Sequence, residues 1–152
     1  MIDQHMNFTQ RLLKHQYPNM NGLWLTQLRG QAHSQATSHA LQVLHIRTNH
    51  IVASTKEKGK AVHVYGSLYS LVDQATAQLI QTNFRCGVKS IHLMLCQKQV
   101  GAADCGLSAI AFATLIAFGE EPRSCSYCPE TMRVYLLTCF QNSYGLVVYE
   151  HD

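Results

Sequence analysis

A cysteine at the junction between a polar segment and an apolar helix is the residue in this sequence best placed to do chemistry. Cys105 follows a stretch of small and polar residues, 99–104, and precedes an almost wholly apolar stretch, 107–118. The apolar stretch predicts a helix that is buried on all sides. Unpaired backbone N–H groups and the positive end of the helix dipole would then meet at the sulfur and favour a nucleophilic thiolate. The alternative is that Cys105 is a small core residue, as free cysteines often are.

A cysteine nucleophile needs a base to accept its proton and a donor to stabilise the oxyanion. His50 opens an expected strand directly after a turn, so its imidazole can project at a sheet edge as the base. Gln99 lies six residues before Cys105, where its amide can donate to an oxyanion together with the Cys105 N–H. The alternatives are a surface or packing histidine, since the chain has nine, and a glutamine that only binds loop backbone. The other strand histidines are interpreted as packing or surface residues: His45, His63 and His92.

Secondary-structure patterns place these residues in an α+β fold, in which helices pack against a small, antiparallel-rich sheet. Alternation and β-branched residues predict strands, and apolar residues three or four positions apart predict helices. The expected strands span residues 41–47, 50–55, 61–65 and 90–95, and residues 145–149 are either a last strand or a frayed tail. The expected helices span residues 3–16, 67–82, 107–118 and 130–139, with Asp3 and Ser67 as caps of the first two. The strands within 41–65 predict an antiparallel meander, while 18–22 predicts a turn and 23–40 a surface loop.

Composition limits the classes of protein to which the chain can belong. The 152 residues carry a net charge of +3 and only 14% charged residues, and the basic ones are scattered, which argues against nucleic acid as a partner. No segment has the roughly 18 apolar residues that a membrane helix needs, and the N-terminus has no secretory pattern. We therefore expect an intracellular protein of the nucleus or cytoplasm, neither secreted nor membrane-bound. In that setting the six cysteines are expected to stay reduced.

Three parts of the sequence occur in a characteristic order. They are His50, the segment Val64-Tyr65-Gly66-Ser67-Leu68-Tyr69, and the pattern Gln99-x5-Cys105-Gly106 with Asp104 before the cysteine. Together they resemble the SUMO and ubiquitin-like protein proteases of the Ulp/SENP type, which are related to the adenovirus protease. The resemblance is greatest to compact Ulp-like domains of animal genomes, often in transposon-derived genes. It implies a single protease domain over residues 1–152, for which an N-terminal truncation is an open alternative.

This resemblance implies a papain-like, Ulp-type α+β fold with site residues in the order His, Asp, Gln, Cys. Matched residue by residue, Cys105 is the nucleophile, His50 the general base and Gln99 the oxyanion donor. The implied reaction is thiolate attack on the carbonyl after a Gly-Gly C-terminus, formation of a thioester and hydrolysis, without a metal or organic cofactor. The implied partner is a ubiquitin-like protein or its conjugate, SUMO-like or other, and the implied state is a monomer.

The sequence departs from the family pattern at three positions. The acidic residue that completes the triad is Gly66 here, and losing an orienting acid can cost roughly 10⁴ in rate, as in another triad enzyme. A cysteine depends on that acid less than a serine does, and a water or Ser67 is an alternative partner for the base. The tryptophan expected after the histidine is Ile51, and the tryptophan expected before the first helix has no counterpart. In the family these two tryptophans close over the diglycine tail.

Two function classes follow from the same residues, and a third from a different pair. The first is a slow or altered cysteine peptidase, and the second is an inactive relic or a module that binds ubiquitin-like proteins. The third is metal binding, because Cys125-x2-Cys128 has the spacing of half a zinc site. That site lacks a second pair, and Cys139 is the one further cysteine nearby in sequence.

Overall fold

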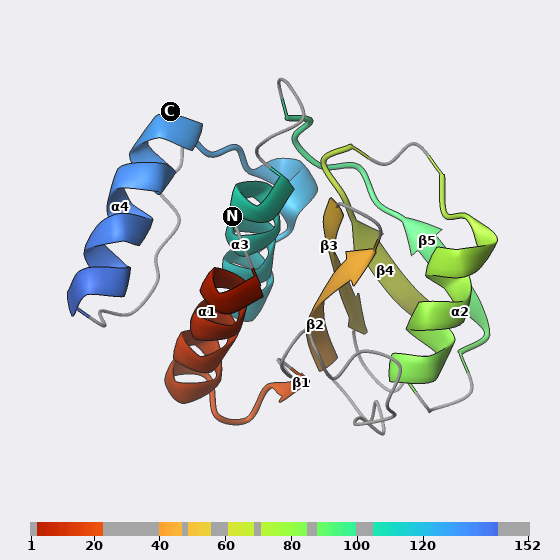
Figure 1. Cartoon of the computed structure of the whole chain (residues 1–152). Helices are drawn as coiled ribbons and strands as arrows, with labels where there is room; N and C mark the ends of the chain where they lie inside the picture. The colour runs from red at the N-terminus through yellow and green to blue at the C-terminus, as the bar shows by residue number, and fades with distance from the viewer. Residues whose placement is uncertain are drawn as a thin grey trace.

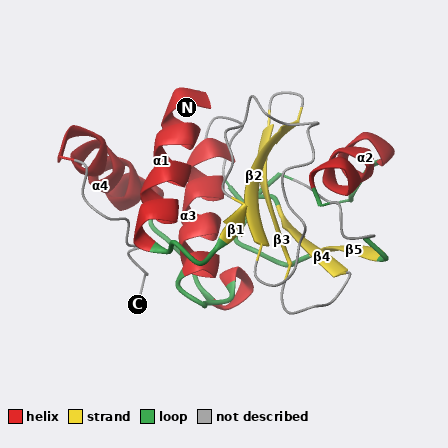
Figure 2. Cartoon of the chain, turned by 90° about the horizontal axis from the view of Figure 1, so that it is seen from below, coloured by secondary structure: helices red, strands yellow, loops and turns green. Residues whose placement is uncertain are grey.

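The structure is a computed structural model that describes residues 3–22, 40–46, 49–55, 61–68, 71–84, 88–99 and 105–142. It has three layers (Figure 1), with α2 on one face of a sheet and α1, α3 and α4 on the other. Figure 2 shows the same layering from below. The described helices are α1 (Asp3–Gln16), α2 (Gln74–Asn83), α3 (Cys105–Ala117) and α4 (Pro129–Asn142), with a short 3-10 turn, η2 (Pro122–Ser124). The predicted α+β class is confirmed. Among the described helices, none has the length and apolar character to cross a membrane.

Five strands form one sheet in the order of the chain. They are β1 (Asn21–Gly22), β2 (Ala40–Ile46), β3 (Asn49–Thr55), β4 (Ala61–Tyr65) and β5 (Ser90–Leu93). The three middle strands pair antiparallel, which confirms the predicted meander. The two edge strands pair parallel to their neighbours, so the sheet is mixed. β5 ends two residues earlier than predicted. Residues 145–149, predicted as a strand or a frayed tail, and the segment 23–39 lie outside the described residues.

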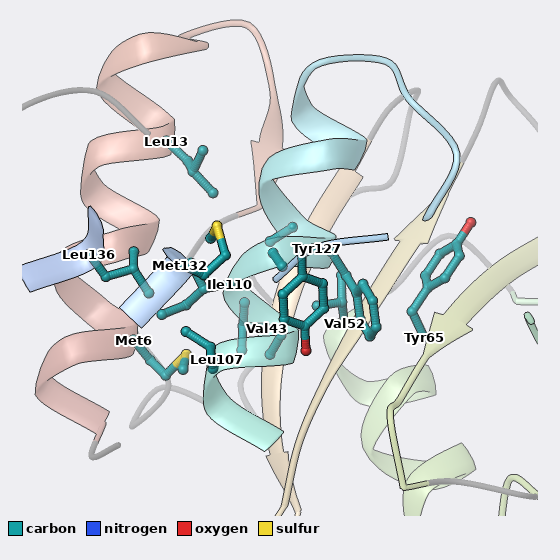
Figure 3. Close-up of a cluster of buried hydrophobic side chains, with 14 of the residues drawn as sticks. Met6, Leu13, Val43, Val52, Tyr65, Leu107, Ile110, Tyr127, Met132 and Leu136 are labelled. Atoms are coloured by element: carbon teal, nitrogen blue, oxygen red, sulfur yellow. The ribbon is translucent and has the colours of Figure 1, made fainter. Parts of the chain in front are cut away.

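Helix α3 occupies the centre of the larger core. Its residues from Cys105 to Leu115 are all buried, as the apolar stretch predicts, whereas Phe118, at the end of the predicted helix, lies beyond α3 and is 52% exposed. Side chains from α1, β2, β3 and α4 converge on it (Figure 3). The labelled members of this cluster include Met6, Leu13, Val43, Val52, Leu107, Ile110, Met132 and Leu136. A separate cluster lies between the other face of the sheet and α2.

The end of α3 is set by a glycine. Gly119 has a φ of +88°, a left-handed conformation that costs glycine little. Its N–H donates to the Ile116 carbonyl, and the Glu120 N–H donates to the Leu115 carbonyl, both at 2.9 Å. These two bonds form a Schellman motif, which satisfies carbonyl groups that the helix itself leaves unpaired.

The turn predicted at 18–22 is partly a strand. The chain turns at residues 17–19, but Asn21 and Gly22 pair parallel with the start of β2. Gly22 has a φ of +91°, and a Cβ placed there would lie 2.1 Å from the Leu41 carbonyl oxygen. Only glycine therefore allows the two backbones to approach this closely.

Prediction of a helix that starts at Ser67 was wrong. Helix α2 begins at Gln74, after Asp73, whose carboxylate accepts the Thr76 N–H at 2.9 Å as an N-cap. Leu68 and Leu71 fall inside the predicted helix 67–82, yet they lie before α2 and are exposed. Ser67 instead lies just after β4, where its hydroxyl donates to the Gln99 side chain.

Shortening a central residue of α3 tests the position of this helix in the core. We expect Ile110→Ala to lower the free energy of unfolding by about 2–5 kcal/mol, because the fully buried side chain leaves a cavity. The measurement is chemical denaturation. Val134→Ala, at a 66% exposed position on α4, is the control and should change the free energy by less than about 0.5 kcal/mol. Equal losses in the two variants would contradict the central position of α3.

Candidate active site

Cys105 lies at the first position of α3, and its side chain is 9% exposed. The first N–H groups of a helix have no partner within that helix, so they point outward as donors. Within α3 itself the first turn carries no acidic residue, and Asp104, directly before the helix, lies outside the described residues. A negative charge that develops beside Cys105 is therefore stabilised by the helix dipole and by these N–H groups. The predicted location of the cysteine, at the start of a buried helix, is confirmed.

His50 comes from the second position of β3 and is directed toward α3. Side chains alternate along a strand, so His50 shares its face with Val52, which packs in the cluster around α3. Ile51 is fully buried in the opposite cluster, beside α2. The His50 Nδ1 lies 3.9 Å from the Cys105 Sγ, although the two residues are 55 positions apart. The histidine is also buried, with 5% of its surface exposed. The geometry lets Nδ1 take the thiol proton directly.

Gln99 is oriented by a hydrogen bond from the end of β4. The Ser67 hydroxyl donates to the Gln99 Oε1, so the carbonyl end of the amide is engaged. The Nε2 group is then the end of the side chain that can donate to a substrate oxygen. Ser67, which the sequence suggested as a substitute for the missing acid, therefore supports the expected oxyanion donor.

Gly66 lies at the position of the expected acid, buried at the end of β4. Its backbone is still used: the Lys98 ammonium donates to the Gly66 carbonyl at 3.5 Å. The neighbouring Tyr65 hydroxyl donates to Glu121 at 2.8 Å and ties the end of β4 to the segment before η2. Burial, together with this carboxylate, raises the pKa of Tyr65. The end of β4 is therefore held in place, but residue 66 offers no carboxylate to the imidazole.

The sequence did not point to the contacts of Gln97, which join the Gln99 segment to α3. The Gln97 Nε2 donates to the Tyr127 carbonyl at 3.0 Å, and the Tyr127 N–H donates to the Gln97 Oε1 at 2.8 Å. The Tyr127 hydroxyl in turn shares a hydrogen bond with Ser108, one turn after Cys105. The only signal in the sequence is that Gln97 lies two positions before Gln99, on the same side of an extended chain.

We expect Gln97→Ala to lower the free energy of unfolding by about 1–3 kcal/mol, because both Tyr127 backbone groups lose a partner. Chemical denaturation measures this loss. Gln81→Ala, at an exposed position on α2, is the matched control and should be within about 0.5 kcal/mol of the wild type. A Gln97 variant as stable as this control would contradict the proposed link between the two segments.

Three further described cysteines, Cys96, Cys125 and Cys128, are not among the predicted site residues. Cys96 is half-buried, and burial raises the pKa of its thiol, partly offset by Lys98 and by the Gly66 N–H. Cys125 and Cys128 are half-buried thiols before α4. Over the part of the chain that the structure describes, no three His, Cys, Asp or Glu side chains gather as metal ligands. The side chain of Cys139, the further cysteine weighed for a zinc site, is outside the described residues.

Comparison with known proteins gives one clear result, at the level of the fold. No protein-family model matches the sequence, and no curated protein matches it significantly. One similar solved structure is "SUMO protease Ulp1 with the catalytic cysteine oxidized to a sulfenic acid", with a TM-score of 0.72 and 11% identity. The match covers 94% of this chain and 78% of that chain. The transposon association stays a prediction. The chain therefore has the fold of this Ulp-type protease, with Cys105 at the start of its central helix.

Proposed function

We propose that the protein is a cysteine peptidase that hydrolyses the bond after the C-terminal diglycine of a ubiquitin-like protein. The observation that carries this proposal is the 3.9 Å approach of the His50 Nδ1 to the Cys105 Sγ at the start of α3. The shared fold with a SUMO protease supports a partner of this class, SUMO-like or other. The four described cysteines form no disulfide, which fits the reducing nucleus or cytoplasm in which we expect the protein to act as a monomer.

The proposed reaction is acyl transfer in two steps. His50 takes the Cys105 proton on Nδ1, and the thiolate attacks the carbonyl carbon of the last glycine. The Cys105 N–H and the Gln99 Nε2 donate to the oxyanion of the tetrahedral intermediate. The C–N bond then breaks, His50 returns its proton to the leaving amine, and a thioester remains. Water, deprotonated by His50, attacks the thioester and releases the carboxylate and the thiol.

Gly66 makes this proposed enzyme slow. The triad acid normally holds the imidazole in one orientation and stabilises the imidazolium that forms during attack. Neither contribution comes from a glycine. The thiol reduces the dependence on the acid, because it ionises more readily than a hydroxyl. We therefore propose a working Cys105–His50 dyad with impaired turnover.

Covalent capture tests the enzyme directly. Ubiquitin-like proteins that carry a C-terminal vinyl sulfone should form one adduct, because the positioned thiolate adds to the electrophile. Peptide mapping by mass spectrometry should locate that adduct on Cys105, and Cys105→Ala should abolish it.

Cys96 is the internal reference in the same experiment. Its raised pKa keeps the thiol protonated at neutral pH, so it should stay unmodified. Labelling of Cys96 to the same extent as Cys105 would show unselective alkylation. No adduct on Cys105 with any of several ubiquitin-like probes would refute the peptidase.

The absence of a carboxylate at Gly66 favours a second candidate, an inactive module of the same fold that binds ubiquitin-like proteins. In this case Cys105 and His50 remain as part of the packed frame, without turnover. Calorimetric titration with the unmodified ubiquitin-like proteins separates the two. Saturable binding without an adduct from the matching probe would support the binding module.

Restoring the acid tests whether residue 66 limits the rate. We expect Gly66→Asp to raise the rate constant of Cys105 labelling by about tenfold or more, since a triad acid can contribute up to roughly 10⁴. Gly66→Asn has nearly the same volume without the charge and is the control. If the Asn variant accelerates labelling as much as the Asp variant, the missing charge does not limit the rate.

A further inference from the structure

The imidazole of His50 has a second aromatic neighbour on the adjacent strand. His45 of β2 is the direct antiparallel partner of His50 in β3. The two rings are stacked, with centroids 4.4 Å apart and an angle of 17° between their planes. Near-parallel rings at this separation match the favourable offset-stacked arrangement of aromatic side chains.

The backbone places both rings on the α3 side of the sheet. His45 follows Val43 by two residues, and Val43 packs in the cluster around α3. His50 shares its face with Val52 of the same cluster. Since cross-strand partners lie on one face, the stacked pair follows from the register of β2 and β3. Only two residues separate the two strands, so this register has little freedom to slip.

A stacked ring restrains the orientation of the His50 side chain. The outer torsion of a histidine side chain is broad, so the ring plane must be fixed by its surroundings. A triad acid does this through a hydrogen bond at the edge of the ring, and Gly66 has no side chain to make one. His45 acts on the face of the ring instead, because turning the His50 ring out of its present plane about the outer torsion would break the stack.

We infer that His45 is a positioning residue, whose stacked ring holds the His50 Nδ1 toward the Cys105 Sγ in place of a triad carboxylate. This inference rests on the proposed Cys105–His50 dyad. It assigns no proton transfer to His45. Only the stacked ring of His45 is needed for this role. A phenylalanine side chain should therefore substitute for it, and an alanine side chain should not.

Alkylation of Cys105 by iodoacetamide tests this inference without any ubiquitin-like protein. At neutral pH, His45→Ala should slow Cys105 alkylation by about three- to tenfold, the equivalent of one aromatic stacking contact. His45→Phe should stay within about twofold of the wild type, because it keeps the stack. His63→Ala is the control, because His63 packs edge-to-face against His92. This variant should have no effect on the alkylation rate. Near pH 10, about where a free thiol is ionised without a base, all variants should converge.

A double-mutant cycle separates positioning from a general structural effect. In a His50→Ala background, adding His45→Ala should cause no further loss, because the residue it positions is gone. An equal loss in both backgrounds, a normal rate in His45→Ala, or a slow, fully folded His45→Phe variant would overturn the inference. The peptidase proposal fails separately, if ubiquitin-like probes leave Cys105 unmodified while iodoacetamide alkylation still responds to His45.

Discussion

Burial of α3 on every side is the constraint on which the rest of the structure depends. A helix with no polar face cannot rotate or slide without exposing apolar surface or opening a cavity in a close-packed core. Residues from α1, β2, β3 and α4 surround it, and the Schellman motif at Gly119 ends it at a defined point. The position of the Cys105 thiol is therefore an outcome of packing over the whole helix. A site residue on such a helix is positioned more precisely than one on a loop, because packing fixes the backbone that carries it.

The candidate site joins three distant parts of the chain to that helix. β3 brings His50 to the thiol, and the end of β4 brings Gly66 and Ser67. The segment after β5 carries Gln99, which is hydrogen-bonded to Ser67, and Gln97, which is hydrogen-bonded to Tyr127. The neutral side chains of Gln97 and Gln99 thus link the sheet to the region around α3 through hydrogen bonds. A glycine at position 66 removes one carboxylate from this frame and leaves its hydrogen bonds in place. The hydrogen bonds of Ser67, Gln97 and Lys98 form without a carboxylate at residue 66.

Local patterns in the sequence were sufficient where an element is defined by its own residues. The bounds of α1, the strands of the meander and the buried character of α3 all follow from apolar spacing and turn residues. Prediction failed where a polar side chain had two possible partners. Ser67 has the properties of a helix cap, but it bonds to Gln99, and the cap is Asp73, six residues later. The β1 pairing was also missed, because two residues become a strand only when β2 lies beside them.

By itself, the sequence determined the α+β class, the location of Cys105 at the start of a buried helix, and the absence of a carboxylate at residue 66. These depend on residue types and on spacings of a few positions, which local sterics and burial translate directly into structure. The resemblance singled out His50 as the base, but only the tertiary structure decided that this imidazole lies against the thiol, and that His45 stacks on its ring. It also decided that Ser67 and Gln97 brace the Gln99 segment. The physical reason is that strand register and the packing of α3 bring together residues far apart in the chain, and neither leaves a local signal.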